Sequence, residues 1–388
     1  MEKFIQGFMA LIKSEVSQYE LTENDLGIIA SLSKDNLYRV SKSHDLAHIV
    51  GAALERNGFL AEGEELTAKF DKQRLIAVYR YRQIEDMYTR ICSVFENEGI
   101  EYLPLKGSVI RPLYREGWQR TSCDIDILIR DTEIDRAVKV LSHEIGFSNE
   151  PFRNYHDVSL IMQGGIHLEL HFCIKESFEK MDRVLVKVWD YARRDENSFK
   201  NNLTPEFFLF YIIAHCACHF MTGGCGVRPL IDLWLIRENM SYNQEIFNSL
   251  LKKAGLIQFA EAILGLSDVW FLNGEREVIT NNMEIYILRS GVYGLVKNKL
   301  AVQTQQHRGI AYFLRKIVIP IDKMAIIYPR VERYPILYPF YYVKRILRRV
   351  LINNRSNKIK EAKRVHGVSE NRMDEISSML EALGLKNV

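Results

Sequence analysis

The spacing of hydrophobic residues divides the chain into three regions. Residues 1–98 follow a helical period, and residues 176–388 return to it with aromatic-rich segments and few strand signals. Residues 99–175 instead contain short apolar runs separated by turn residues. We therefore predict an α+β fold, in which a small mixed-sheet domain of residues 99–175 is flanked by a helical N-terminal region and a helical C-terminal domain.

Two amphipathic patterns are the clearest helix signals. The longer one ends at Gly99 and places the following residues at helix-like intervals: Leu75, Tyr79, Ile84, Met87, Ile91 and Phe95. The second lies near the end of the chain, with Ser369 as a candidate cap and Gly384 as a stop. Its apolar face consists of Met373, Ile376, Leu380 and Leu383. We expect this last helix to pack against the rest of the protein.

The middle region alternates between the two kinds of pattern. The runs IEYLPLKG, DIDILI, DVSLIM and IHLELHF are typical of strands, and the helix candidates VIRPLY and DTEIDRAVKVLSHEIG lie between the first three. Gln163, Gly164 and Gly165 separate the last two runs and favour a hairpin. The order β-α-β-α-β-β predicts a small mixed sheet that is open on one side.

The overall charge is nearly balanced. The chain has 52 Lys or Arg and 49 Asp or Glu, a net charge of +3, which argues against a nucleic-acid coat protein. Locally, nine basic residues lie between Lys344 and Arg364 against one acid, Glu361. A nucleic-acid or acidic-membrane contact is conceivable there, but such runs more often form a solvated helix face. Nucleic-acid binding is therefore not favoured.

The remaining bulk features indicate a cytoplasmic protein. The first twenty residues mix charges and lack an apolar core with a cleavage site, so we expect no signal peptide. No window of about 18 uncharged apolar residues appears, so a membrane-spanning helix is not expected. The six cysteines follow no disulfide-scaffold spacing, which favours reduced thiols.

The run DIDILI carries two carboxylates on one face. Because side chains alternate along a strand, Asp124 and Asp126 point the same way, and their repulsion favours a cation between them. Such a pair suits Mg²⁺, with Mn²⁺ as an alternative. If IHLELHF pairs beside this strand, Glu169 completes a three-carboxylate site for two metals, with Asp157 as the rival third acid.

A glycine turn precedes this strand and supplies the complementary chemistry. Gly107 lets the backbone approach phosphate closely, and Ser108 adds a hydroxyl donor at the start of the short helix. Lys106 and Arg120 lie on either side of this segment and supply positive charge for phosphate groups. We predict that this turn binds phosphate.

Several histidines and charged residues are candidates for lining the same cleft. His167 and His171 flank Glu169 on its face of the strand, where they would orient substrate or form structural hydrogen bonds. His215 and His219 are four residues apart, the spacing of a zinc-binding helix, although a pair of cleft-lining histidines is the favoured interpretation. Arg228 and Asp232 follow on the next segment and are candidates for the substrate side.

In these segments the chain resembles the nucleotidyltransferase superfamily, which has the fold of DNA polymerase beta. The resemblance is carried by LPLKGSVIRPLY, RTSCDIDILI and IHLELHF, and by AHCACHFMTGGCGVRPLIDLW more loosely. It is closest to a bacterial branch of uncharacterised nucleotidyltransferases, in which a Lys-Gly turn replaces the usual Gly-Gly or Gly-Ser and an Arg precedes Asp-Ile-Asp.

The resemblance implies a reaction and a set of roles. The protein would transfer a nucleoside monophosphate from an NTP to an acceptor, a small molecule or a protein, and release pyrophosphate. Asp124 and Asp126 would bind two Mg²⁺, and Glu169 would bind the catalytic metal or take the acceptor's proton. Lys106, Gly107 and Ser108 would hold the triphosphate. No motif indicates the acceptor or the preferred base.

Two alternatives stay open at this point. One is a catalytically degenerate nucleotide-binding or scaffold protein in which the acids persist without activity. The other is an RNA-directed terminal nucleotidyltransferase, which would need a basic groove next to the metal site. The balanced net charge argues against the second.

Overall fold

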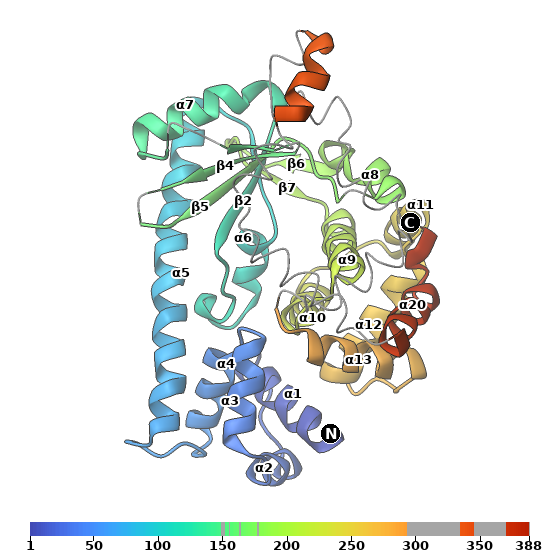
Figure 1. Ribbon diagram of the computed structural model, residues 1–388. Coiled ribbons are helices and arrows are strands. Elements are labelled where there is room, and N and C mark those ends of the chain that lie inside the picture. Colours follow the sequence, from blue (N-terminus) through green and yellow to red (C-terminus); the bar gives the residue numbers. More distant parts are fainter. Residues whose placement is uncertain are drawn as a thin grey trace.

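The computed structural model describes residues 1–148, 152–154, 156–162, 164–176, 178–292, 334–344 and 370–387. Of the basic run that begins at Lys344, only that lysine is among them, so the rest of the run lies outside the described residues. The candidate cap Ser369 also lies outside them. The α+β class is confirmed, because helices surround one small mixed sheet (Figure 1).

The sheet contains five strands in the order β1-β2-β5-β4-β3. Strands β2 and β5 are parallel, and the other neighbours are antiparallel. The predicted hairpin is present as β4 and β5. The two-residue edge strand β3 was not predicted. The strands are β1 (Tyr102–Pro104), β2 (Asp124–Ile129), β3 (Phe152–Arg153), β4 (Asp157–Ile161) and β5 (His167–His171).

The predicted helices of this region are present, and a further hairpin joins it. Helix α6 (Gly107–Ile110) follows β1, and α7 (Ile134–Glu144) follows β2. The hairpin of β6 (Ala192–Arg194) and β7 (Asn201–Leu203) contacts β1 through a bridge between Tyr102 and Lys200. Sequence reasoning missed this hairpin because strands this short and polar have no apolar alternation.

Helices cover the apolar face of the sheet. The long helix α5 (Glu65–Glu98) runs along one side of the molecule and, with α7, covers this face (Figure 1). Ile125, Ile127 and Leu168 from the sheet pack there against Ile91 and Phe95 of α5. The opposite face carries the carboxylates of β2 and β5, so the apolar packing fixes which way they point.

The pattern in α5 was only partly correct. Leu75 and Tyr79 were placed with the apolar set, but their side chains are exposed, 69% and 65% respectively. In this half of the helix Phe70 and Ala77 are buried instead. Phe70 packs against Gly51 of helix α4 (Ala47–Arg56), where an added Cβ would lie 2.8 Å from the Phe70 side chain. The face of α5 that is buried is therefore set by its partner helix.

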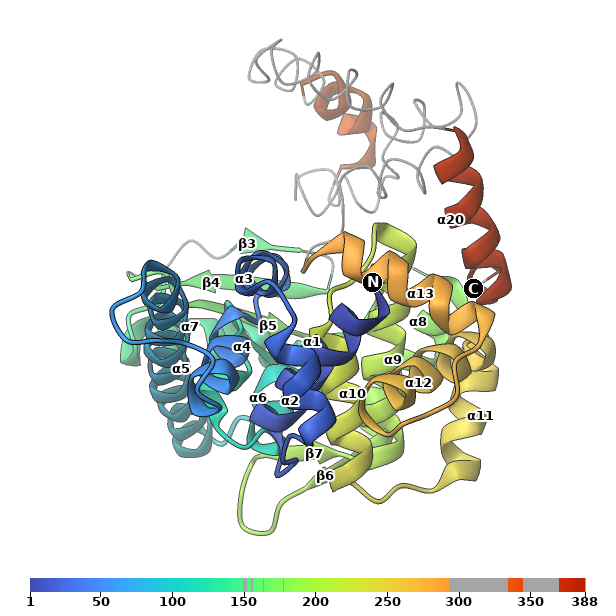
Figure 2. The ribbon, with the colours of Figure 1, turned by 90° about the horizontal axis from the view of Figure 1, so that it is seen from below.

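The remaining helices share a second apolar core. In Figure 2 the N-terminal helices lie beside α10 and α12, and residues of both groups belong to one buried cluster. The N-terminal helices are α1 (Glu2–Val16), α2 (Glu23–Ala30), α3 (Lys34–Ser43) and α4 (Ala47–Arg56). The later ones are α8 (Glu179–Leu185), α9 (Pro205–Thr222), α10 (Arg228–Asn239), α11 (Gln244–Ala254), α12 (Ile257–Phe271) and α13 (Val278–Ser290). The three-domain boundaries stay a prediction.

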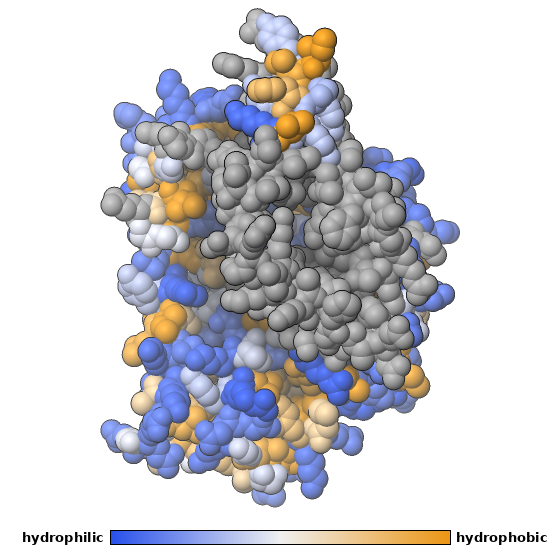
Figure 3. Space-filling model, viewed as in Figure 1, coloured by the Kyte–Doolittle hydropathy of each residue, from blue (hydrophilic) through white to orange (hydrophobic). Residues whose placement is uncertain are grey.

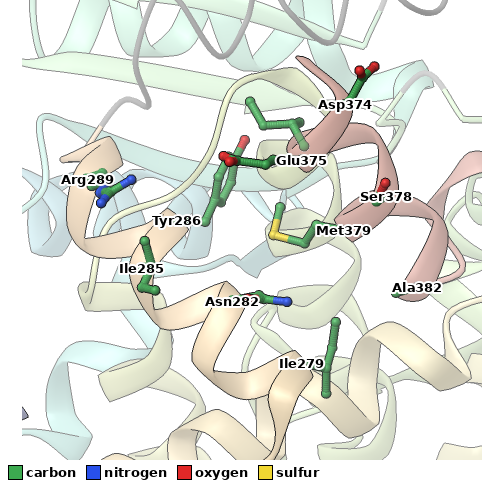
Figure 4. Close-up of a pocket in the computed structure, with 11 residues that line it drawn as sticks. Ile279, Asn282, Ile285, Tyr286, Arg289, Asp374, Glu375, Ser378, Met379 and Ala382 are labelled. Carbon is green, nitrogen blue, oxygen red and sulfur yellow. The ribbon is translucent and has the colours of Figure 1, made fainter. Parts of the chain in front are cut away.

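The last helix packs as expected. Helix α20 (Glu370–Ala382) buries Ile376, Leu380 and the following Leu383, and Gly384 ends it with a φ of 70°. A cavity of about 870 Å³ lies between α20 and α13 (Figure 4). Its lining comes from these two helices, so it is separate from the carboxylates of the sheet.

The described surface mixes polar and apolar residues. Figure 3 shows hydrophilic residues interspersed with separate apolar patches over the N-terminal helices and α5. Among the described helices, none combines the length and the apolar character that crossing a membrane requires.

Replacing Ile127 by alanine should lower the free energy of unfolding by about 2–5 kcal/mol, because this fully buried side chain leaves a cavity beneath the carboxylates. The matched control, Leu75→Ala, should change it by less than about 0.5 kcal/mol, since Leu75 is exposed. Urea denaturation followed by circular dichroism measures both. Equal losses in the two variants would contradict the placement of the core.

Candidate active site

The carboxylates converge where β2 and β5 run in parallel. The register places Asp126 opposite Glu169 and Asp124 opposite His167. Side chains that face each other across a parallel pair lie on the same side of the sheet, so the three acids share one face. Asp126 is buried, whereas the Glu169 side chain keeps 26% of its surface exposed. The pairing of strands on which the predicted three-acid site depends is therefore present.

Asp126 is neutralised by two neighbours. Lys106 Nζ donates to its Oδ1 at 2.9 Å, and His171 Nε2 lies 3.0 Å from the same oxygen. Burial alone would raise the pKa of Asp126, but Lys106 and His171 hold it well below its usual range. Burial likewise opposes the charge of Lys106, yet Asp126 raises the pKa of that ammonium well above its usual value. Lys106 and Asp126 therefore form an ion pair in which both side chains are charged.

Asp124 lies in a different electrostatic environment. Its pKa is raised, first by burial and then by the negative charges of Asp126 and Glu169, with Lys106 opposing them. His171 responds to the same cluster: burial lowers its pKa, but the hydrogen bonds to Asp126 and Glu169 raise it above its usual value. The cluster therefore has more negative charge than its neighbours compensate, and a divalent cation would relieve this repulsion.

The turn before α6 is held in an uncommon conformation. Lys106 has a φ of 40°, a region that residues other than glycine rarely occupy. Gly107 follows it, and an added Cβ there would lie 2.9 Å from Nη1 of Arg120. The Ser108 N–H donates to the Leu105 carbonyl at 3.2 Å and is used within the turn. This backbone shape aims Lys106 at Asp126 and brings Arg120 over the glycine.

Arg120 is fixed by a buried ion pair with α10. Its Nε and Nη2 donate to the two oxygens of Asp232 at 3.1 and 3.0 Å, and Tyr114 Oη donates to the same carboxylate at 2.7 Å. Burial opposes the charge of Arg120, but Asp232 raises the pKa of the guanidinium. This contact joins the segment before β2 to α10, and it leaves Nη1 facing Gly107.

Arg228 makes a second connection at the start of α10. Its Nη1 donates to the Thr121 carbonyl at 2.7 Å and lies 3.5 Å from Asp45. Asp45 also accepts from the Thr121 hydroxyl at 2.6 Å. The predicted residues Arg228 and Asp232 therefore both anchor the segment that leads into Asp124.

The predicted histidine pair also lies at the cleft. His215 Nδ1 lies 2.7 Å from Glu176 Oε1, and His215 Nε2 lies 3.0 Å from His219 Nε2. Burial, followed by the nearby His215, lowers the pKa of His219 to about 4. Burial opposes the charge of Glu176, but His215 holds the pKa of that carboxyl at about 2. Sequence reasoning did not identify Glu176.

Asp157 has partners of its own. It lies 2.8 Å from His156 Nε2 and accepts from the Asn154 amide at 2.8 Å. It faces His171 across β4 and β5, whereas Glu169 faces Asp126 directly. Asp157 therefore lies one strand farther from Asp126 than Glu169 does.

A cavity of about 320 Å³ brings most of these residues together. The predicted residues that line it are Lys106, Gly107, Arg120, Asp124, Asp126, His215, His219, Arg228 and Asp232. Its wall also includes His44 and Asp45 from the turn between α3 and α4, which sequence reasoning missed. In this turn Asp45 has a positive φ of 56°. Ser108, Glu169 and His171 are not part of its lining.

The donor atoms fit a divalent cation. Asp124, His167 and Glu169 form one group whose ligand atoms lie within 4.8 Å of one another, and Asp126, Glu169 and His171 form another. Carboxylate oxygens suit both Mg²⁺ and Mn²⁺, whereas the imidazole nitrogens favour Mn²⁺ over Mg²⁺. Glu169 belongs to both groups and so connects them.

Comparison with known proteins decides the family. The sequence model of a family described as uncharacterised nucleotidyltransferase matches residues 31–272, which include both strands of the carboxylate cluster, the turn and helices α9 and α10. The chain belongs to this nucleotidyltransferase family. No curated protein and no solved structure matches it.

For this nucleotidyltransferase, the two aspartates should respond oppositely to pH in metal-free buffer. The folded-state pKa of Asp124 is raised, so its contribution to stability is present at acid pH and is lost as pH rises through that pKa. Asp124→Asn should therefore gain stability relative to wild type as pH rises from below 4 to neutral, the range above the ordinary pKa of 3.8. Urea denaturation at a series of pH values with a chelator measures this.

The matched variant is Asp126→Asn. Because its folded-state pKa is lowered, Asp126 stabilises the fold above its ordinary pKa, and this contribution is lost as pH falls. The variant should be less stable than wild type at neutral pH, and the difference should shrink in acid. If both variants were more stable than the wild type at neutral pH, or both less stable, the assignment of charges would be refuted.

The contact between Arg120 and Asp232 should be among the most sensitive in the protein. Asp232→Ala leaves a buried guanidinium without its carboxylate, which should lower the free energy of unfolding by about 3–5 kcal/mol. Glu133→Ala, which removes a surface partner of Arg136, should cost less than about 1 kcal/mol. If denaturation shows that Asp232→Ala loses no more free energy of unfolding than Glu133→Ala, the buried ion pair is not needed to hold α10.

Proposed function

We propose that this nucleotidyltransferase transfers a nucleoside monophosphate from an NTP to an acceptor, a small molecule or a protein, and releases pyrophosphate. The observation that carries the proposal is the convergence of Asp124, Asp126 and Glu169 on adjacent parallel strands beside a cleft with cationic walls. A protein that only bound a nucleotide would not require three acids on one face, where they repel one another.

The carboxylates would hold the metals of the reaction. Asp124, Asp126 and Glu169 are the oxygen donors, with His167 and His171 as nitrogen donors at the edges. When bound, Mg²⁺ or Mn²⁺ would neutralise phosphate charge and align the attacking and leaving oxygens. The raised pKa of Asp124 supports this assignment, because a site short of positive charge is suited to a cation.

The turn would hold the triphosphate. Two of the three guanidinium nitrogens of Arg120 are used by Asp232, and the third, Nη1, lies over Gly107. A phosphate oxygen at that glycine would meet this donor without a side chain in the way. Lys106 would exchange its contact with Asp126 for one with phosphate. Such catalysis consists mainly of positioning and charge stabilisation.

The proposal predicts the fate of a label. With NTPs that carry ³²P at the α position and a cell extract as the source of acceptors, the wild-type protein should move the label onto a new product. The double variant Asp124→Ala/Asp126→Ala should form none, while circular dichroism shows that it stays folded. A control with the label at the γ position should yield labelled pyrophosphate only. Full activity of the double variant would contradict the site.

Binding distinguishes this proposal from a degenerate module. An NTP with Mg²⁺ or Mn²⁺ should raise the melting temperature of the wild type, because a ligand that binds only the folded state stabilises it. Binding without any transfer would favour a catalytically degenerate nucleotide-binding protein. If no NTP raises the melting temperature with either metal, the nucleotidyltransferase activity itself is refuted.

A further inference from the structure

We propose that His215 is the general base of the reaction, held and oriented by Glu176, and that it takes the proton of an acceptor hydroxyl. The inference rests on the proposed function and adds a residue outside the metal cluster. It begins from the chain of contacts in which His215 lies between Glu176 and His219 at 2.7 and 3.0 Å.

The protonation states of this chain follow from its partners. Because Glu176 is a carboxylate, it can only accept a hydrogen bond, so Nδ1 of His215 carries the proton on that side. In the neutral form of the ring, Nε2 carries the electron pair, and Nε2 of His219 donates to it across the 3.0 Å contact. The arrangement thus presents a basic nitrogen, oriented by a carboxylate, as in the His–Asp pairs of acyl-transfer enzymes.

Both rings lie at the cleft. Tyr211, His215 and His219 recur every fourth residue on α9 and form one stripe, and the two histidines line the 320 Å³ cavity together with Asp124 and Asp126. Lys106 lies between the two groups, since it pairs with Asp126 and its ammonium interacts with Glu176 and Tyr211. The two histidines and the two aspartates therefore line the same cavity, with Lys106 between them.

In the structure His219 Nε2 occupies the position of the hydroxyl, 3.0 Å from His215 Nε2. Once the two rings separate, an acceptor hydroxyl would take the place of this contact and donate its proton to His215 Nε2. As this O–H bond breaks, the acceptor oxygen forms a bond to the α-phosphorus of the NTP, and the bond from that phosphorus to pyrophosphate breaks. The proton stays on His215, where Glu176 stabilises the imidazolium, until it passes to solvent.

A zinc-binding role and a purely structural role fit these two histidines less well. A zinc site would need further ligands, and among the described residues neither His215 nor His219 belongs to a group of three metal-ligating side chains. A purely structural role would not require both rings to line the cavity. The groups that face this pair, and that must be considered in any pH profile, are Glu176, Tyr211, Cys218, Lys106 and Arg228.

The first test removes the base and restores it chemically. His215→Ala should bind NTP like the wild type in the thermal-shift assay but form labelled product about a hundredfold more slowly, or slower still. Added imidazole should restore the rate in proportion to its unprotonated concentration, because it can occupy the space of the lost ring. A role in folding alone would not produce this rescue. His143→Ala, which removes an exposed imidazole, is the control.

The second test changes the partner and leaves the base in place. Glu176→Gln keeps a hydrogen-bond acceptor for His215 Nδ1 but removes the charge that stabilises the imidazolium. The rate should fall, and the acid limb of the pH–rate profile should move to lower pH. The ³¹P spectrum of the product should show a phosphodiester, as transfer to a hydroxyl requires.

The outcomes separate the two proposals. A wild type that binds no NTP and labels nothing refutes the proposed function. If the wild type transfers the label, the proposed function stands and only the role of His215 is at issue. That role is overturned if His215→Ala keeps a rate within about threefold of the wild-type rate. It is also overturned if imidazole gives no rescue and Glu176→Gln keeps the wild-type pH profile. Two further results would overturn the role of His215 as the base. One is zinc that stays bound to the wild type in the presence of a chelator but is absent from His215→Ala. The other is a phosphoanhydride product.

Discussion

The ion pair between Lys106 Nζ and Asp126 Oδ1, 2.9 Å apart, allows a parallel pair of strands to carry three acids on one face. Without a positive charge, carboxylates this close would have to take up protons or separate. The chain supplies the charge from a lysine whose backbone is held at a φ of 40°, so the turn and the strand depend on each other. The same ammonium would be available to phosphate once a metal ion takes its place at Asp126.

The rest of the site is built around that pair. The apolar face of β2 and β5 packs on α5 and α7, which directs the acids to the other side. On that side, the two hydrogen bonds between Arg120 and Asp232 fix the segment before β2 to α10. Helix α9 contributes His215 and His219 to the lining of the same cavity. A cleft between a sheet and two helices results, in which each wall carries one part of the proposed chemistry: metal donors, phosphate donors and a base.

Local patterns predicted much of this arrangement. The period of two in DIDILI and IHLELHF gave the orientation of Asp124, Asp126 and Glu169, because alternation along a strand needs no knowledge of distant residues. The hairpin and the helices of the middle region were predicted for the same reason. The family followed from the spacing of these motifs, and the match over residues 31–272 confirms it.

The parts that were missed depend on contacts between distant segments. Asp45 lies 76 residues from the hydroxyl of Thr121 that it binds, and Glu176 lies 39 residues from His215. Neither has a periodic pattern that would mark it. Leu75 and Tyr79 fit the helical period of α5 but are exposed, because a period shows which residues share a face and not which partner covers it. The hairpin of β6 and β7 was too short to show alternation.

The central claim is that the three acids form a metal site in which Lys106 stands in for positive charge. Electron paramagnetic resonance of Mn²⁺ tests it directly, because bound and free Mn²⁺ have different spectra. The wild type should bind Mn²⁺, more tightly when an NTP is present, and Asp124→Asn/Asp126→Asn should bind none. Lys106→Ala should bind the ion alone more tightly than the wild type, since the competing ammonium is gone. Mn²⁺ binding that is unchanged in the double variant would contradict the account.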